Sequence, residues 1–89
     1  MAERIIHFDN AREAQDVTGA REEYLPALEQ AFGVAAVSRD LWLKLEGEAA
    51  QVAAAGAFVD GLLRARNAGL PLNRHAVDYA RQAYVEGRG

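Results

Sequence analysis

The side chains that could perform catalysis or bind a metal are few and widely spaced in this sequence. Thr18 and Ser38 are its only threonine and serine, and neither has a general base beside it in the sequence. His7 and His75 lie far apart and lack a histidine or carboxylate at i+4, the spacing at which a helix presents metal ligands. Cysteine is absent, which excludes thiolate metal sites, disulfides and thiol nucleophiles. We therefore expect no catalytic residues, no metal and no cofactor in this chain.

Gly19 and Arg21 form the first candidate binding site, at the start of a predicted helix. Free amides and the helix dipole favour an anion at such a position, and glycine lets a phosphate approach the backbone. The alternative is a plain turn between helices with a solvated arginine. Glu22 and Glu23 support that alternative, because carboxylates oppose an anion there.

Arg39 and Lys44 form a second candidate site in a predicted hairpin. Arg39 lies at its turn and Lys44, the single lysine of the chain, on the outer face of the following strand. Together they predict a patch that follows a nucleic-acid backbone. The alternative is an ion pair between Arg39 and the adjacent Asp40.

Trp42 is the candidate interface residue, and three interpretations apply to it. It stacks on a nucleic-acid base, it packs against a neighbouring domain or partner protein, or the last helix covers it with Tyr79 or Tyr84. Packing is favoured over base stacking, because a small soluble domain rarely leaves a tryptophan bare.

Length and charge limit the classes of protein to which this chain can belong. Its 89 residues have room for one domain. The net charge of −3 argues against a dedicated non-specific nucleic-acid binder, so a contact with RNA would depend on a local cluster of arginines. No stretch approaches a membrane span, and the N-terminus lacks the layout of a signal peptide. We expect a cytoplasmic protein that does not bind membranes.

Hydrophobic periodicity predicts the elements that position these residues. In the hairpin, Leu41, Leu43 and Leu45 are expected to face the core, while Trp42 and Lys44 face outward. An asparagine with a glutamate three residues later predicts a capping box at the first helix. The predicted elements are strand 4–8, helices 10–18 and 22–32, strands 34–37 and 41–46, helix 48–67, and a last helix capped by Asn73.

These elements predict an α+β fold in which a small three-stranded sheet packs on helices. Their order, strand, helix, helix, strand, strand, helix, helix, is that of a minimal KH-like fold with one extra C-terminal helix. The longest helix, 48–67, is expected to pack on the sheet through Val52, Ala55 and Val59, with Gly56 allowing a close approach.

Short motifs at the joints of these elements match a known pattern in order and spacing. They are TGAREEYL at 18–25, LEQAFGV at 28–34, SR at 38–39, LKLEGE at 43–48, and Gly69, Leu70, Leu72 and Val77. The pattern resembles the N-terminal KH-like domain of PhoH-like, phosphate starvation-inducible proteins, and the likeness covers nearly the whole chain. Glu22 stands where the Gly-x-x-Gly loop of a KH domain has its second glycine.

The resemblance implies an RNA-binding or RNA-positioning module that is followed by a P-loop ATPase domain. Its implied partners are single-stranded RNA and the downstream ATPase domain or another protein. ATP and magnesium are expected only in that downstream domain, because the Walker A pattern is absent here. The alternative function is a protein–protein docking or self-association module with the same fold and no affinity for RNA.

Overall fold

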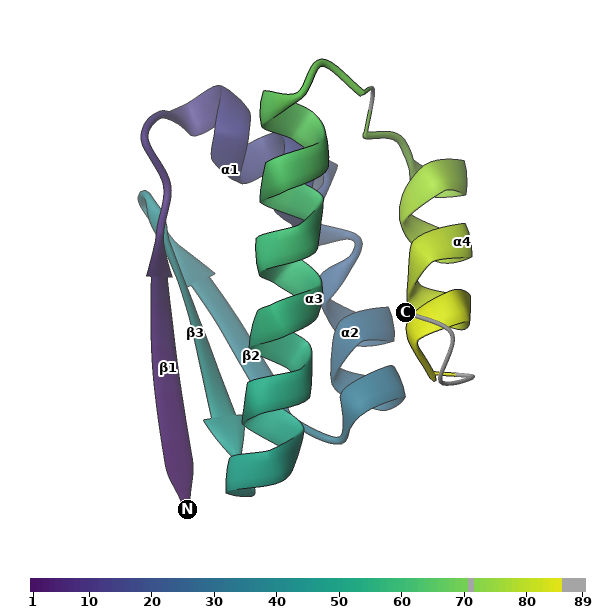
Figure 1. Cartoon of the computed structure of the whole chain (residues 1–89). Coiled ribbons are helices and arrows are strands. Elements are labelled where there is room, and N and C mark those ends of the chain that lie inside the picture. Colours follow the sequence, from purple (N-terminus) through teal and green to yellow (C-terminus); the bar gives the residue numbers. More distant parts are fainter. Residues whose placement is uncertain (71, 86–89) are drawn as a thin grey trace.

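The computed structural model describes residues 1–70 and 72–85 and has one sheet layer and one helical layer (Figure 1). The sheet is antiparallel, with strand order β1-β3-β2. The elements are β1 (Ala2–His7), α1 (Ala11–Thr18), the 3-10 turn η1 (Ala20–Glu22), α2 (Leu25–Phe32), β2 (Ala35–Arg39), β3 (Trp42–Gly47), α3 (Ala49–Asn67) and α4 (Arg74–Val85). The predicted α+β class and the predicted order of strands and helices are confirmed.

The start of α1 is held by side-chain caps. The side chain of Asn10 accepts a hydrogen bond from the Glu13 N–H at 2.8 Å, and Glu13 in turn accepts one from the Asp9 N–H at 2.9 Å. The predicted pair of Asn10 and Glu13 is therefore present. Glu13 returns to the residue before the cap rather than to the cap itself, which also ties the end of β1 to the helix.

The second helix begins three residues later than predicted. Arg21 and Glu22 have φ values of 55° and 60°, in the left-handed region, so the chain forms a 3-10 turn before α2 starts at Leu25. Pro26 then lies in the first turn of α2, where its missing N–H costs no helical hydrogen bond. Glu22 thus adopts a backbone conformation that glycine would adopt without strain.

In the hairpin of β2 and β3, the predicted alternation of inward-facing and outward-facing side chains is confirmed for β3, but not for Leu41, the residue before this strand. Leu43 and Leu45 are fully buried, whereas Leu41 is 40% exposed. The prediction that Leu41 faces the core is wrong. Arg39 pairs with Trp42, so Asp40 and Leu41 form the turn, and the alternation of a strand does not extend into it.

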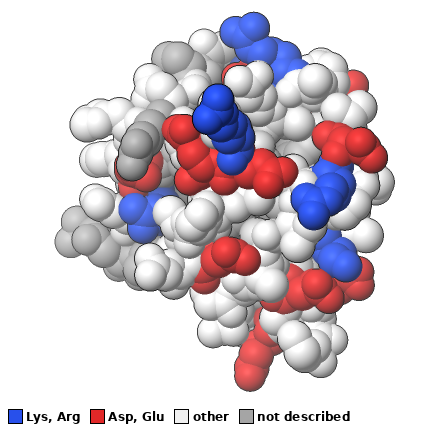
Figure 2. Space-filling view, turned by 180° about the vertical axis from the view of Figure 1, so that it is seen from behind, with Lys and Arg blue, Asp and Glu red and all other residues white. Residues whose placement is uncertain are grey.

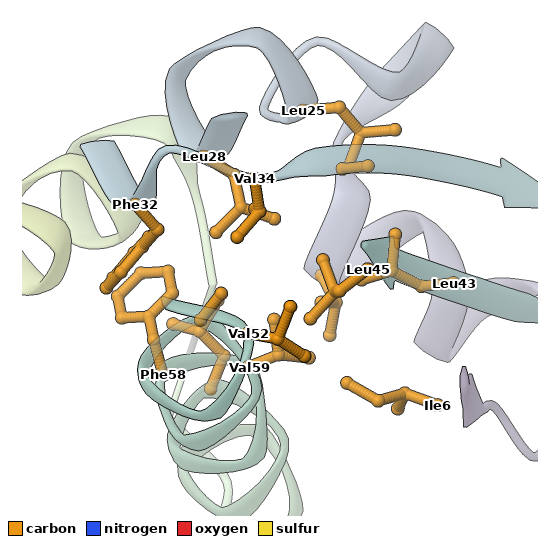
Figure 3. Packing of buried hydrophobic residues seen from close by; sticks show 14 of the residues in the cluster. Ile6, Leu25, Leu28, Phe32, Val34, Leu43, Leu45, Val52, Phe58 and Val59 are labelled. Carbon is orange, nitrogen blue, oxygen red and sulfur yellow. The ribbon is translucent and has the colours of Figure 1, made fainter. Parts of the chain in front are cut away.

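The core lies between the sheet and α3 (Figure 3). On the sheet side it is formed by Leu43 and Leu45, and on the helix side by Val52 and Val59, all less than 5% exposed. A tilted ring contact, with 5.4 Å between centroids, joins Phe32 of α2 to Phe58 of α3. One continuous apolar cluster therefore holds the two layers together.

Gly56 on α3 leaves room for the side chain of Arg4 on β1. A Cβ at this position would meet the guanidinium of Arg4 on β1. That guanidinium donates to both carboxylate oxygens of Asp60, one turn further along α3, each at 2.9 Å. The Arg4 side chain therefore occupies the space beside Gly56, and the predicted close approach of the helix backbone to the sheet stays a prediction.

The last helix packs on α2 and α3, and Figure 1 shows it on the opposite side of the molecule from β1. Val77 is buried and Tyr79 is 76% exposed. The side chain of Tyr84 lies outside the described residues. Among the helices described, none has both the length and the apolar character needed to cross a membrane.

A partly buried ion cluster ties α1 to the end of α3. Arg66 donates to Asp16 at 2.8 Å and lies 3.4 Å from the carboxylate of Glu13, which is only 6% exposed. Replacing Arg66 with methionine is expected to lower the free energy of unfolding by about 1–2 kcal/mol, because two carboxylates lose their cation. Chemical denaturation measures the difference.

Arg12→Met is the matched control for that substitution. Arg12 also pairs with Asp16, at 3.6 Å, but its side chain is 81% exposed. Since exposed ion pairs contribute little, we expect a change below about 0.5 kcal/mol. Equal effects of the two substitutions would contradict a structural role for the buried cluster.

Candidate binding surface

One face of the sheet carries no helix, and its residues follow from the strand register. Inward-facing residues of β3 and β2, such as Leu43 and Ala36, are buried, whereas their neighbours on the other face are exposed or half-buried. Directly paired residues share a face of the sheet. This surface, called the open face below, consists of Glu3, Ile5, His7, Ala35, Val37, Arg39, Trp42, Lys44 and Glu46.

The side chains of a histidine, a tryptophan and an arginine form one row across the open face. Trp42 on the central strand pairs with His7 on β1 and with Arg39 on β2. Trp42 is half-buried, and both neighbours are exposed. Arg39 donates one N–H to the carbonyl of Ser38 at 2.8 Å, which leaves the rest of its donors to face solvent.

The remaining rows change from apolar to acidic along the strands. Lys44 lies between Ile5 and Val37, and its ammonium group is 3.6 Å from the carboxylate of Glu46. The last row pairs Glu46 with Glu3. The open face therefore has its aromatic group and Arg39 near the hairpin turn, apolar side chains on both sides of Lys44 in the middle row, and carboxylates near the N-terminus.

The loop of Gly19 and Arg21 belongs to the helical layer, not to the open face. Three amides at its end, those of Glu22, Glu23 and Tyr24, donate to backbone carbonyls at 3.0–3.2 Å. Arg21 is exposed. The structure therefore brings together three of the five predicted site residues, Arg39, Trp42 and Lys44, and places Gly19 and Arg21 on a different element.

Charge is mixed on the surface opposite to the view of Figure 1. Figure 2 shows basic side chains separated from one another, with acidic groups beside several of them. Ion pairs between exposed or partly exposed side chains include Arg12–Asp16 and Lys44–Glu46. Among the described residues on this face, a ligand with many negative charges would find local contacts rather than a continuous basic track.

The described residues offer neither a catalytic arrangement nor a metal-ligand cluster. The Thr18 hydroxyl is buried and donates to the Ala14 carbonyl at 2.8 Å. Ser38 is buried on the inner face of β2. No group of three or more histidine and carboxylate side chains in the described residues could hold a metal ion. A cavity of about 20 Å³ between the helices has room for no more than one water molecule.

Two residues at the sheet have roles that the sequence does not predict: His7 on the open face and Glu29 at the free edge of β2. His7 was considered only as a metal ligand, whereas it lies beside Trp42 on the open face. Glu29 on α2 accepts a hydrogen bond from the Ala36 N–H at 3.0 Å, at the free edge of β2. Strand pairing and tertiary contact create both roles, and no local motif encodes either of them.

Comparison with known proteins adds no relative to this description. No family model, no curated protein and no solved structure matches the chain. Its function is therefore argued from the open face itself.

Proposed function

We propose that this protein is a non-enzymatic module that binds single-stranded RNA on the open face of its sheet. The observation that carries the proposal is the row of His7, Trp42 and Arg39 across three strands. An aromatic ring on a sheet stacks on a base, and a flanking arginine contacts the adjacent phosphate. The resemblance to PhoH-like proteins, which are linked to RNA metabolism, supports RNA as the ligand and a downstream ATPase domain as the partner that receives it.

The contacts of the two basic residues are compatible with phosphate binding. Arg39 retains several donors beside the one given to Ser38. Lys44 is paired with Glu46 at 3.6 Å between partly exposed side chains, and such a pair contributes little energy. A phosphate can therefore replace Glu46 as the partner of Lys44 at small cost. The mixed surface charge predicts weak binding that is sensitive to salt.

Because Trp42 is the only tryptophan, its fluorescence reports directly on the proposed site. Titration with a short oligouridine at low ionic strength is expected to quench this emission. Trp42→Ala is expected to weaken binding about fivefold to one-hundredfold, the worth of one stacked base, when followed through a label on the RNA. Arg39→Glu is expected to weaken binding and to reduce its dependence on salt.

Arg64→Glu and Arg21→Glu are the matched controls, since each makes the same change of charge away from the open face. Both arginines are exposed on the helical layer. We expect Arg39→Glu to weaken binding more than either control. An equal loss in all three would show that net charge, not the open face, governs binding. No binding at low salt would refute the proposal and favour the protein-docking alternative.

A further inference from the structure

The outer edge of β1 carries backbone groups that no other segment of the described chain binds. The Phe8 N–H donates to the Leu41 carbonyl at 2.8 Å, and Phe8 follows β1 in the same register. Residues of an antiparallel strand bond alternately to one side and the other. The N–H and C=O groups of Glu3, Ile5 and His7 therefore point away from β3, to the free edge.

The other edge of the sheet is protected. On β2, Glu29 accepts from the Ala36 N–H at 3.0 Å, and Arg39 donates to the Ser38 carbonyl at 2.8 Å. Such side-chain cover prevents a strand from pairing with another chain. On β1, no described side chain bonds the outward backbone groups, although Glu3 and Arg4 are charged, and the strand pairs with β3 without a bulge over its whole length. Figure 1 shows no helix beyond β1 on that side.

We propose that a second copy of this chain binds here, with the two β1 strands antiparallel and the two sheets joined into one of six strands. The sequence of β1 selects the register. When the two-fold axis passes through Ile5, this residue faces the partner's Ile5, and Glu3 faces the partner's His7. Ile5 is 47% exposed in the single chain, and the contact covers it.

Other registers that satisfy the same backbone groups place like charges opposite each other or shorten the contact. Moving the two-fold axis from Ile5 to Arg4 places Arg4 opposite the partner's Arg4. Moving it to Glu3 places Glu3 opposite the partner's Glu3. Moving the axis to His7 places His7 opposite the partner's His7 and leaves Glu3 without a neighbour on the partner's β1. Like charges in directly paired positions destabilise a sheet. The register centred on Ile5 alone combines an apolar pair with two pairs of complementary polarity.

Sedimentation equilibrium from low micromolar to millimolar concentrations tests the proposal, with Ile5→Pro as the main variant. The Ile5 N–H donates to no other described residue, so an edge strand tolerates proline at this position. In the dimer the substitution removes both hydrogen bonds of the central pair. We expect self-association to weaken at least about tenfold. Ile5→Val, which retains the N–H, should associate like the unchanged chain.

A charge exchange tests the register itself and does not depend on the proline variant being folded. Glu3→His and His7→Glu are each expected to weaken association, because each places groups of the same kind opposite one another. The double variant restores complementary pairs and should recover the association. Hydrogen exchange should show that the amides of Ile5 and His7 gain protection as protein concentration rises.

Three results would overturn the inference. They are a monomer at every concentration, an Ile5→Pro variant that associates as strongly as Ile5→Val, and a double exchange that fails to recover. The first two results can be obtained while the open face still binds RNA, because the unchanged chain and the Ile5 variants retain the row of His7, Trp42 and Arg39. His7→Glu changes that row, so RNA binding is compared in the Ile5 variants and not in the charge exchange.

Discussion

Replacing Leu43 with alanine is expected to lower the free energy of unfolding by about 3–4 kcal/mol. Leu43 is fully buried on the middle strand of the sheet, facing the core that α3 covers. The substitution removes apolar contact and leaves a cavity that the surrounding strands and helices cannot close. Urea denaturation followed by far-ultraviolet circular dichroism measures the loss. In a domain of 89 residues, this is a large part of the total stability.

Leu41→Ala is the matched control, because it makes the same chemical change two residues earlier in the chain. Leu41 lies in the hairpin turn and is 40% exposed, and the contact between its carbonyl and the Phe8 N–H involves the backbone only. We expect a change below about 0.5 kcal/mol. A loss comparable with that of Leu43→Ala would show that the alternation does extend to Leu41.

The contrast between these two leucines shows how far local patterns determine this fold. Alternation predicted that Leu43 and Leu45 face inward, and helical spacing predicted the buried face of α3. Alternation does not indicate where a strand stops, so Leu41 was placed in the core. The turn depends on which residues pair across β2 and β3, a property of two segments together.

The candidate site was predictable in part, for the same physical reason. Arg39, Trp42 and Lys44 belong to one hairpin, so the phase of a single strand was enough to place them near one another. His7 joins them only because β1 pairs with β3, at a sequence separation of 35 residues from Trp42. Strand order depends on the packing of the whole chain, and the sequence contains no local signal for it.

Gly19 was predicted as an anion site, but its geometry indicates that its main role is conformational. Its φ of 86° and ψ of 163° lie in a region that residues with a Cβ rarely adopt. A Cβ would also lie 2.7 Å from the Cγ of Glu23 and 2.9 Å from the ring of Tyr24. We expect Gly19→Ala to lower the free energy of unfolding by about 2–3 kcal/mol, as measured by urea denaturation.

Gly69→Ala separates the two causes of that loss. Gly69 also has a positive φ, 94°, but a Cβ there would have no neighbour within 4 Å. Its substitution carries backbone strain without the steric contact, so we expect a smaller loss of about 1 kcal/mol. A Gly19→Ala variant that keeps full stability and loses affinity for RNA would reverse the assignment. The loop between α1 and α2, rather than the open face, would then be the surface that approaches the phosphate backbone.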